Sequence, residues 1–328
     1  MPKPRKRLRK ETYEKVGSHS AVQLCNWTKK SLKNEGVCFK EEFYGIKSHL
    51  CCQMTPSIFC NNRCIHCWRD TTEARNEMIS KPDEPKKIID DAIKAQRKLL
   101  SGFGIDKNSE KKQLSKADLK KFEEAQNPKN FTFSLTGEPT LYPKLGELIR
   151  EVHSRNATSF LVTNGLQPEV IEKLVLENNL PTRLVVTVNS SDEKDYSKFH
   201  NSLKKDAWKN LTKTLEIISK IKKKNTIIRI NLIREINMEE KNVKEFAEII
   251  AKTNPFIVGI KAYMPVGFAR ERLGYEKAPT FDETLDFAKK LEKQIDDENY
   301  KIVAVHKPSR YFILSKNKED LKIKKEAY

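Results

Sequence analysis

Short apolar runs alternate with longer amphipathic stretches from about residue 50 onward. Apolar runs bounded by turn residues predict strands, and apolar positions at helical spacing predict helices. The expected strands cover residues 51–59, 131–135, 158–162, 183–189, 226–233 and 256–262. The expected helices cover residues 84–101, 144–154, 168–177, 204–222, 240–252 and 281–294. Six such β/α units predict an α/β fold with a parallel sheet and right-handed crossovers, either an open wound sheet or a full or partial barrel.

The remaining segments lack this alternation. Residues 106–130 are polar and charged, and predict a surface insertion between the first helix and the second strand. The mixed-charge end, Ser315 to Tyr328, is expected to be solvated. The expected division is a basic, cysteine-bearing extension over 1–49, a core over 50–306 and a charged C-terminal segment over 307–328.

Composition adds a strong positive charge to this pattern. The 328 residues include 63 Lys and Arg against 45 Asp and Glu, so the formal net charge is +18. This balance favours a polyanionic partner, through steering and counterion release. The longest apolar runs have strand length, which argues against a membrane span. No apolar segment of signal-peptide length follows the basic start, and we expect a cytoplasmic protein.

All seven cysteines lie between residues 25 and 67. Disulfides are rare in a reducing compartment, so this clustering favours metal binding. Cys60, Cys64 and Cys67 are spaced Cys-x3-Cys-x2-Cys after the first expected strand. Three thiolates can hold three irons of a 4Fe-4S cluster and leave the fourth open to a ligand with amino and carboxylate groups. The alternative is zinc, with His66 or Cys52 as the fourth ligand.

A second set of cysteines stands upstream. Cys25, Cys38 and Cys51 are each 13 residues from the next, a spacing too long for one tight loop. Three separate segments would have to converge on the metal, again as a three-coordinate cluster with an open iron. Cys52 is expected to be a plain buried thiol. The alternative is that all four upstream cysteines are structural.

The downstream motif, followed by Trp68 on the first β/α unit, resembles the radical S-adenosylmethionine (SAM) superfamily. Thr136-Gly137-Glu138-Pro139 and Thr163-Asn164-Gly165 end the next two strands, where the superfamily has SAM-binding turns. Barrel enzymes gather catalytic groups at such strand ends. The resemblance implies a SAM-bound 4Fe-4S cluster on Cys60, Cys64 and Cys67, and SAM contacts from Thr136, Gly137, Glu138, Asn164, Asn189 and Ser190.

The upstream Cys-x12-Cys-x12-Cys, with Phe-Lys after its second cysteine, resembles the tRNA 4-demethylwyosine synthase family over essentially the whole chain. That likeness implies a partial (β/α)6 TIM-like barrel with two 4Fe-4S clusters, the second on Cys25, Cys38 and Cys51. It also implies condensation of N1-methylguanosine-37 of phenylalanine tRNA with pyruvate, with Lys40 as the Schiff-base lysine. An amine near a cationic metal centre is expected to have a lowered pKa. Residues 1–24 leave no room for the flavodoxin-like domain of eukaryotic members, so a separate flavodoxin- or ferredoxin-type electron donor is expected.

Later strand ends offer tRNA contacts, namely Lys261, Arg270 and Arg272, although neighbouring apolar residues could equally cap the core. Two other functions remain open at this point. One is another radical SAM enzyme that modifies RNA, such as a methylthio- or methyltransferase. A requirement for pyruvate would distinguish the synthase from such an enzyme. The other is a zinc-dependent RNA-binding protein without catalysis, which would lack the visible absorbance of an iron-sulfur centre.

Overall fold

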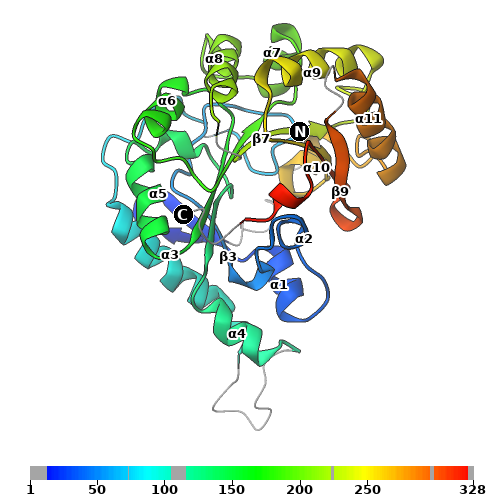
Figure 1. Ribbon diagram of the computed structural model, residues 1–328. Coiled ribbons are helices and arrows are strands. Elements are labelled where there is room, and N and C mark those ends of the chain that lie inside the picture. The colour runs from blue at the N-terminus through cyan, green and yellow to red at the C-terminus, as the bar shows by residue number, and fades with distance from the viewer. Residues whose placement is uncertain (1–12, 73, 105–115, 223–224, 296–298, 324–328) are drawn as a thin grey trace, which may run out of the picture.

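A ten-stranded sheet forms the centre of the computed structural model, which describes residues 13–72, 74–104, 116–222, 225–295 and 299–323. The strand order is β1-β2-β3-β4-β5-β6-β7-β8-β10-β9. Its parallel strands are β3 (Cys51–Thr55), β4 (Asn130–Phe133), β5 (Thr158–Thr163), β6 (Arg183–Thr187), β7 (Thr226–Leu232) and β8 (Ile257–Ala262). The six expected strands all form, and the sheet curves as a partial barrel (Figure 1).

Helices cover the outer side of this sheet, one after each parallel strand (Figure 1). These are α3 (Pro85–Leu100), α5 (Leu145–Ser154), α6 (Pro168–Leu176), α8 (Ala207–Ser219), α9 (Glu240–Thr253) and α11 (Phe281–Gln294). Each matches an expected helix within a few residues. Their apolar faces pack on the sheet in one large core, so the six β/α units follow from the hydrophobic pattern.

The N-terminal extension has more structure than its weak pattern indicates. An antiparallel hairpin of β1 (Glu14–Val16) and β2 (Ser20–Gln23) adds two strands beside β3. The hairpin is followed by α1 (Asn26–Leu32) and α2 (Phe39–Tyr44), which lie near the lower end of β3 in Figure 1. These elements place the upstream cysteines against the sheet.

The expectation of a charged segment from residue 307 is wrong for its central part. β10 (Tyr311–Ser315) is completely buried and pairs antiparallel with both β8 and β9 (Lys301–His306). The apolar residues Tyr311 to Leu314 form this strand because they pack into the sheet between two partners. The C-terminal strands therefore extend the barrel wall, and the solvated-end expectation for Ser315 is also incorrect.

The polar insertion contains α4 (Leu119–Ala125), capped by the Asp118 carboxylate, which accepts the Lys121 N–H at 3.1 Å. The rest of the insertion before residue 116 lies outside the described residues. His49 Nε2 contacts Glu124 Oε2 at 2.7 Å and so ties the insertion to the extension.

The remaining described helices are α7 (Glu193–His200) and α10 (Gly267–Leu273), with short 3-10 turns η1 (Ser48–Leu50), η2 (Ser101–Phe103), η3 (Pro139–Leu141), η4 (Lys307–Ser309) and η5 (Glu319–Leu321).

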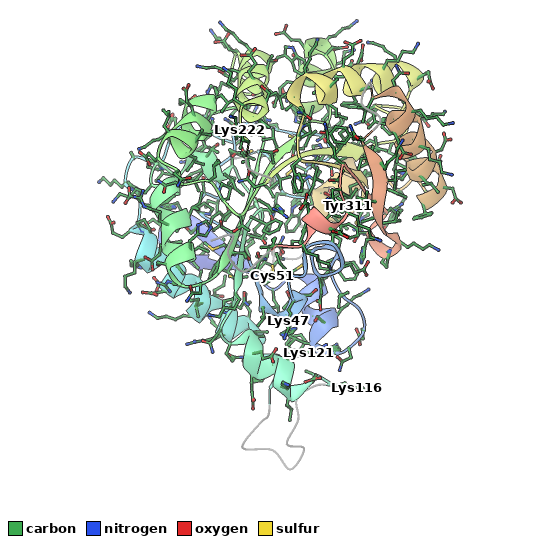
Figure 2. The ribbon with its side chains drawn as sticks, in the orientation of Figure 1. Lys47, Cys51, Lys116, Lys121, Lys222 and Tyr311 are labelled. Carbon is green, nitrogen blue, oxygen red and sulfur yellow. The ribbon has the colours of Figure 1, made fainter. Side chains whose placement is uncertain are left out.

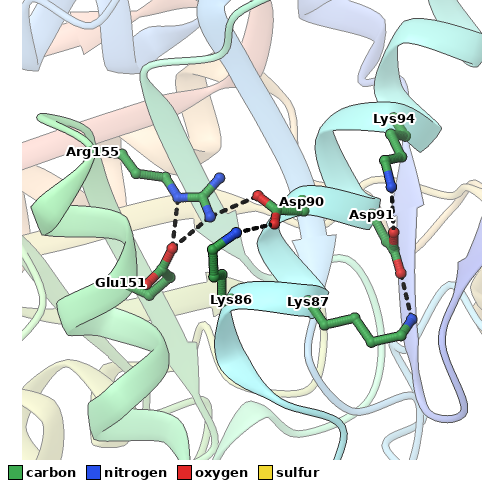
Figure 3. A network of polar contacts seen from close by, with 7 residues as sticks. All are labelled: Lys86, Lys87, Asp90, Asp91, Lys94, Glu151 and Arg155. Atoms are coloured by element: carbon green, nitrogen blue, oxygen red, sulfur yellow. Dashed lines mark hydrogen bonds and ion pairs between the residues drawn. The ribbon is translucent and has the colours of Figure 1, made fainter.

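Charged networks lie on the outside of the fold. Figure 3 shows Asp90 of α3 between Lys86 and Arg155, at 2.7 Å from each, and Arg155 also bonds Glu151 on α5. Exposed pairs of this kind contribute about 0–1 kcal/mol each. They join two neighbouring helices but do not position the interior. No described helix is long and apolar enough to cross a membrane.

Candidate active site

A cavity of about 770 Å³ lies inside the curved sheet, and its lining brings both cysteine triads together. In Figure 2, Cys51 and Tyr311, which both line it, lie within the molecule, whereas Lys116 lies at its edge. The six cysteines on its wall are Cys25, Cys38, Cys51, Cys60, Cys64 and Cys67. The structure therefore joins two sets that are separated in the sequence.

The downstream triad lies on the loop that follows β3. Cys60 and Cys67 are fixed by backbone bonds, since the Cys60 carbonyl accepts the Arg75 N–H at 2.9 Å and the Cys67 N–H donates to the Cys64 carbonyl at 3.1 Å. Arg272 bonds the carbonyls of Ile65 (3.0 Å) and Cys67. The loop is thus held in shape by main-chain contacts that leave the thiols facing the cavity.

Burial and mutual repulsion keep these thiols protonated in the absence of a counter-charge. Burial raises the pKa of Cys64, and the charges of Cys60 and Cys67 raise it further. The pKa of Cys60 is raised by burial and by Glu138. A metal that binds thiolates repays this cost, because its positive charge stabilises the deprotonated sulfurs.

The donor set has the chemistry of an iron-sulfur site, because three thiols of one loop line the cavity. Within the described ranges, no three Cys, His, Asp or Glu side chains gather closely enough to share a single metal ion. The three sulfurs of one loop nevertheless face one cavity. A cluster accepts ligands at separate corners, whereas zinc needs them around one centre.

The upstream triad converges from three elements. Cys25 and Cys38 immediately precede α1 and α2, and Cys51 is the first residue of β3. Burial raises the pKa of Cys38 to about 12, while Lys40 opposes the shift. Burial and the charge of Cys51 likewise raise the pKa of Cys25. Cys52 points to the other side of β3, into the core under the helices, so its expected role as a plain buried thiol is confirmed.

Lys40 lies at the centre of this second group. Its Nζ donates to Cys51 Sγ at 3.3 Å and to Thr132 Oγ1 at 2.7 Å, and it lies over the Phe160 ring. Asn130 also donates to Cys51 Sγ, at 3.1 Å. Burial acts to lower the pKa of Lys40, but the charges of Cys51, Cys38 and Cys25 outweigh it and raise the pKa. The chain's own charges therefore act against the lowered pKa that the sequence suggests.

The Thr136-Gly137-Glu138 turn also lines the cavity, next to the first cysteine loop. Gly137 has φ +70°, and an added Cβ would lie 2.0 Å from the Ser57 carbonyl oxygen. The Glu138 N–H donates to the Phe59 carbonyl at 2.7 Å. Glycine is required here because two backbone segments meet without room for a side chain.

The Glu138 carboxylate is buried and well bonded. It accepts hydrogen bonds from Thr163 Oγ1 at 2.7 Å, from the Asn164 N–H at 2.8 Å and from Thr140 Oγ1 at 2.7 Å. The Thr140 N–H also donates to it, at 3.1 Å. Burial raises the pKa of Glu138, and these four donors act in the opposite direction. The two turns singled out in the sequence are therefore directly joined.

Asn189 and Ser190 lie behind the cavity wall. Asn189 Oδ1 accepts the Asn231 N–H at 2.8 Å, and Asn189 Nδ2 lies 3.3 Å from His66 Nε2. Ser190 is buried, and its Oγ has no hydrogen-bond partner among the residues that the structure describes. Neither lines the cavity, so the residues that reach it from this side are Asn231 and His66.

The three basic residues expected to contact tRNA are in different surroundings. Lys261 faces the cavity interior, where burial and the charge of Arg229 lower its pKa to about 8. Arg272 holds the cysteine loop. Arg270 lies outside and bonds the Tyr275 hydroxyl at 3.2 Å. The structure does not bring them together as one surface.

The sequence places Arg229 near the end of an expected strand but assigns it no role in the site. It occurs in a mostly apolar strand, TIIRINL, and it faces the cavity with its Nε buried and without a hydrogen-bond partner among the described residues. A charged residue inside a buried strand was the available signal. His200, 3.0 Å from Cys64 Sγ through Nδ1, gave no such signal because it ends a surface helix.

Comparisons with known proteins agree with this geometry. The radical SAM superfamily model matches residues 54–247. The chain is therefore a radical SAM enzyme, a class whose members use a 4Fe-4S cluster and SAM, and the non-catalytic zinc alternative is set aside.

A second family model, for wyosine base formation, matches residues 252–316. A SAM-dependent tRNA 4-demethylwyosine synthase from Pyrococcus abyssi is 39% identical over 95% of this chain and 88% of its own. The one from Methanocaldococcus jannaschii is 35% identical over 94% of each. The chain belongs to this tRNA 4-demethylwyosine synthase family.

A solved structure of the same family is also similar over nearly the whole chain. The structure of TYW1 with a lysine-pyruvate adduct bound superposes with a TM-score of 0.80, at 32% identity, over 94% of this chain and 95% of that chain. The crystal structure of archaeal TYW1 superposes at 0.72 and 29% identity. The expected partial (β/α)6 barrel is thereby confirmed.

Proposed function

We propose that the chain condenses N1-methylguanosine-37 of phenylalanine tRNA with pyruvate to form 4-demethylwyosine. The observation that carries this proposal is that two cysteine triads and Lys40 line one cavity. The family gives the reaction, and the shared cavity lets two substrates meet.

The downstream triad, Cys60, Cys64 and Cys67, would hold the SAM-bound 4Fe-4S cluster. Bound there and reduced, the cluster and SAM would supply a 5′-deoxyadenosyl radical, the species that removes hydrogen from the N1-methyl group. The Thr136-Gly137-Glu138 turn would receive the ammonium of SAM, because its carboxylate and carbonyl groups are hydrogen-bond acceptors. Asn164 would add a contact from the next strand end. Asn189 and Ser190 would support the ribose side from behind His66 and Asn231.

The upstream triad, Cys25, Cys38 and Cys51, would hold a second 4Fe-4S cluster beside the pyruvate. Lys40 would form an imine with C2 of pyruvate, with loss of water, as the amine nitrogen bonds to the former carbonyl carbon. Thr132 Oγ1, 2.7 Å from the amine, would orient it. A lysine-pyruvate adduct in the name of a solved relative supports this assignment.

Partners outside the cavity follow from charge and chemistry. The net charge of +18 suits a tRNA backbone, and the exposed Arg270 would contact it. A separate flavodoxin- or ferredoxin-type protein would supply electrons in the cytoplasm.

The test is anaerobic reconstitution followed by assay with methylated tRNA, SAM, pyruvate and reductant. The nucleoside product is measured by mass spectrometry, and 5′-deoxyadenosine is measured in parallel. We expect Cys60→Ala to abolish 5′-deoxyadenosine. Cys38→Ala should keep some uncoupled SAM cleavage but form no tricyclic base.

Cys52→Ala is the matched control, since it removes a thiol next to Cys51 that points away from the cavity. It should retain both products. SAM cleavage that survives in Cys60→Ala contradicts the first cluster. Normal product from Cys38→Ala contradicts the second, and a pyruvate-independent product favours another RNA modification.

A further inference from the structure

Two cations inside the cavity are not used by the proposed function. Arg229 lies on β7 and Lys261 on the adjacent β8, in a register that pairs Arg229 with Gly259 and Asn231 with Lys261. Alternate residues of a strand share a face. Both side chains therefore point to the inner side of the sheet, where both line the cavity.

Neither cation has a carboxylate partner in the part of the chain that the structure describes. Arg229 Nη2 donates to Thr187 Oγ1 at 2.9 Å, and its Nε is buried without a partner. Burial lowers the pKa of both side chains. Burying an unpaired charge costs free energy, so an anion that binds beside these two cations is strongly stabilised.

The other groups on the cavity wall leave these cations available. Its acidic residues are Asp70 and Glu138, whose described partners are Thr72 for Asp70 and four other donors for Glu138, not Arg229 or Lys261. Lys40 and Asn130 contact Cys51, whereas Arg229 and Lys261 form no described hydrogen bond to a cysteine. The charges of Cys38 and Cys25 also act on Lys261, but it is Lys40 that donates a hydrogen bond to a thiol.

We propose that Arg229 and Lys261 form a carboxylate site that binds the carboxylate of pyruvate while Lys40 holds its C2 carbon. This inference rests on the proposed function, which places pyruvate at Lys40. The carboxyl carbon of pyruvate is bonded directly to C2, so both ends must be held within one small volume. Guanidinium and carboxylate groups bind through two parallel hydrogen bonds, and the ammonium adds a third.

The apolar floor beneath these groups helps to define the site. Phe160, Val185 and Ile227 belong to a buried cluster inside the barrel, and all three line the cavity. Lys40 lies 5.3 Å over the Phe160 ring. Such a floor accepts a methyl group, while the cations select a negative charge. The site therefore selects a short 2-keto acid over a neutral ketone.

The test measures adduct formation on the reconstituted enzyme. Borohydride traps the imine formed with labelled pyruvate, mass spectrometry locates the modified lysine, and the half-saturating concentration is determined for pyruvate and for its uncharged methyl ester. The variants are Arg229→Gln, Lys261→Met and the charge-retaining Arg229→Lys. Lys252→Met, an exposed lysine at the end of α9, is the matched control. Absorbance near 400 nm confirms equal cluster content.

We expect the half-saturating pyruvate concentration to rise about 10- to 100-fold in Arg229→Gln and Lys261→Met, the range for losing one hydrogen bond to a charged group. The methyl ester and the Lys252→Met control should be unchanged, and Arg229→Lys should recover part of the loss. Unchanged pyruvate binding in both variants, or an equal loss for the ester, overturns the inference.

Two further outcomes separate this inference from the proposed function. An adduct that persists in Lys40→Met but disappears in Lys261→Met makes Lys261 the nucleophile and overturns the carboxylate site. Wild-type enzyme that traps pyruvate with the expected selectivity but forms no tricyclic base refutes only the proposed reaction. Wild-type enzyme that traps no pyruvate refutes the carboxylate site, whatever the tRNA product.

Discussion

Gly137→Ala tests whether the close contact between the Glu138 turn and the first cysteine loop is required. The glycine has φ +70°, which costs about 1–2 kcal/mol for a residue with a side chain. The new Cβ would lie 2.0 Å from the Ser57 oxygen and 2.7 Å from the Phe59 oxygen, both backbone atoms. Overpacking adds about 1–3 kcal/mol. The total is about 2–5 kcal/mol.

This strain either lowers the free energy of unfolding or is relieved by a displacement of the turn. We expect urea unfolding of the metal-free chain to report a fall of this size in the free energy of unfolding. If the turn moves instead, SAM binding to the reconstituted enzyme weakens, about 30-fold for 2 kcal/mol. Gly102→Ala is the control, because no atom of the described part of the chain lies within 4 Å of its added Cβ. A Gly137→Ala variant with unchanged stability and SAM affinity would refute the reasoning.

Three further predictions concern charge and local order. Lys261→Met should stabilise the metal-free chain by at most about 3 kcal/mol at pH 7, from the shift of the Lys261 pKa to about 8. Between the folded and unfolded pKa values of Lys261, the folded state binds fewer protons than the unfolded state, so wild-type stability rises from pH 8 upward. The difference in urea unfolding between wild type and Lys261→Met should therefore vanish near pH 10.5. A difference that stays constant with pH would contradict this prediction. Arg272→Ala should speed iron loss to a chelator severalfold, because it frees the carbonyls of the cysteine loop, whereas an equal effect from Arg270→Ala would contradict this role. Asp118→Ala should cost about 1 kcal/mol in thermal or urea unfolding through loss of the α4 cap, and no change would exclude that contribution.

Both cysteine triads line one cavity, but the local sequence predicts a common ligand for the downstream triad more directly than for the upstream one. Cys60, Cys64 and Cys67 lie on one short loop, so their spacing alone indicates a common ligand. Cys25 and Cys38 reach the cavity because α1 packs on η1 and α4 and α2 packs against β9. That packing is non-local, and spacing cannot specify it.

The amino-acid sequence by itself determined the six β/α units, the first cysteine loop and the two turns that Glu138 connects. These features depend on hydrophobic periodicity and on residues that are near one another in the chain. Only the tertiary structure decided that β10 is inserted beside β8 and that Arg229 and Lys261 face the same interior. Strand partners and side-chain surroundings come from contacts between distant segments, which local patterns do not contain.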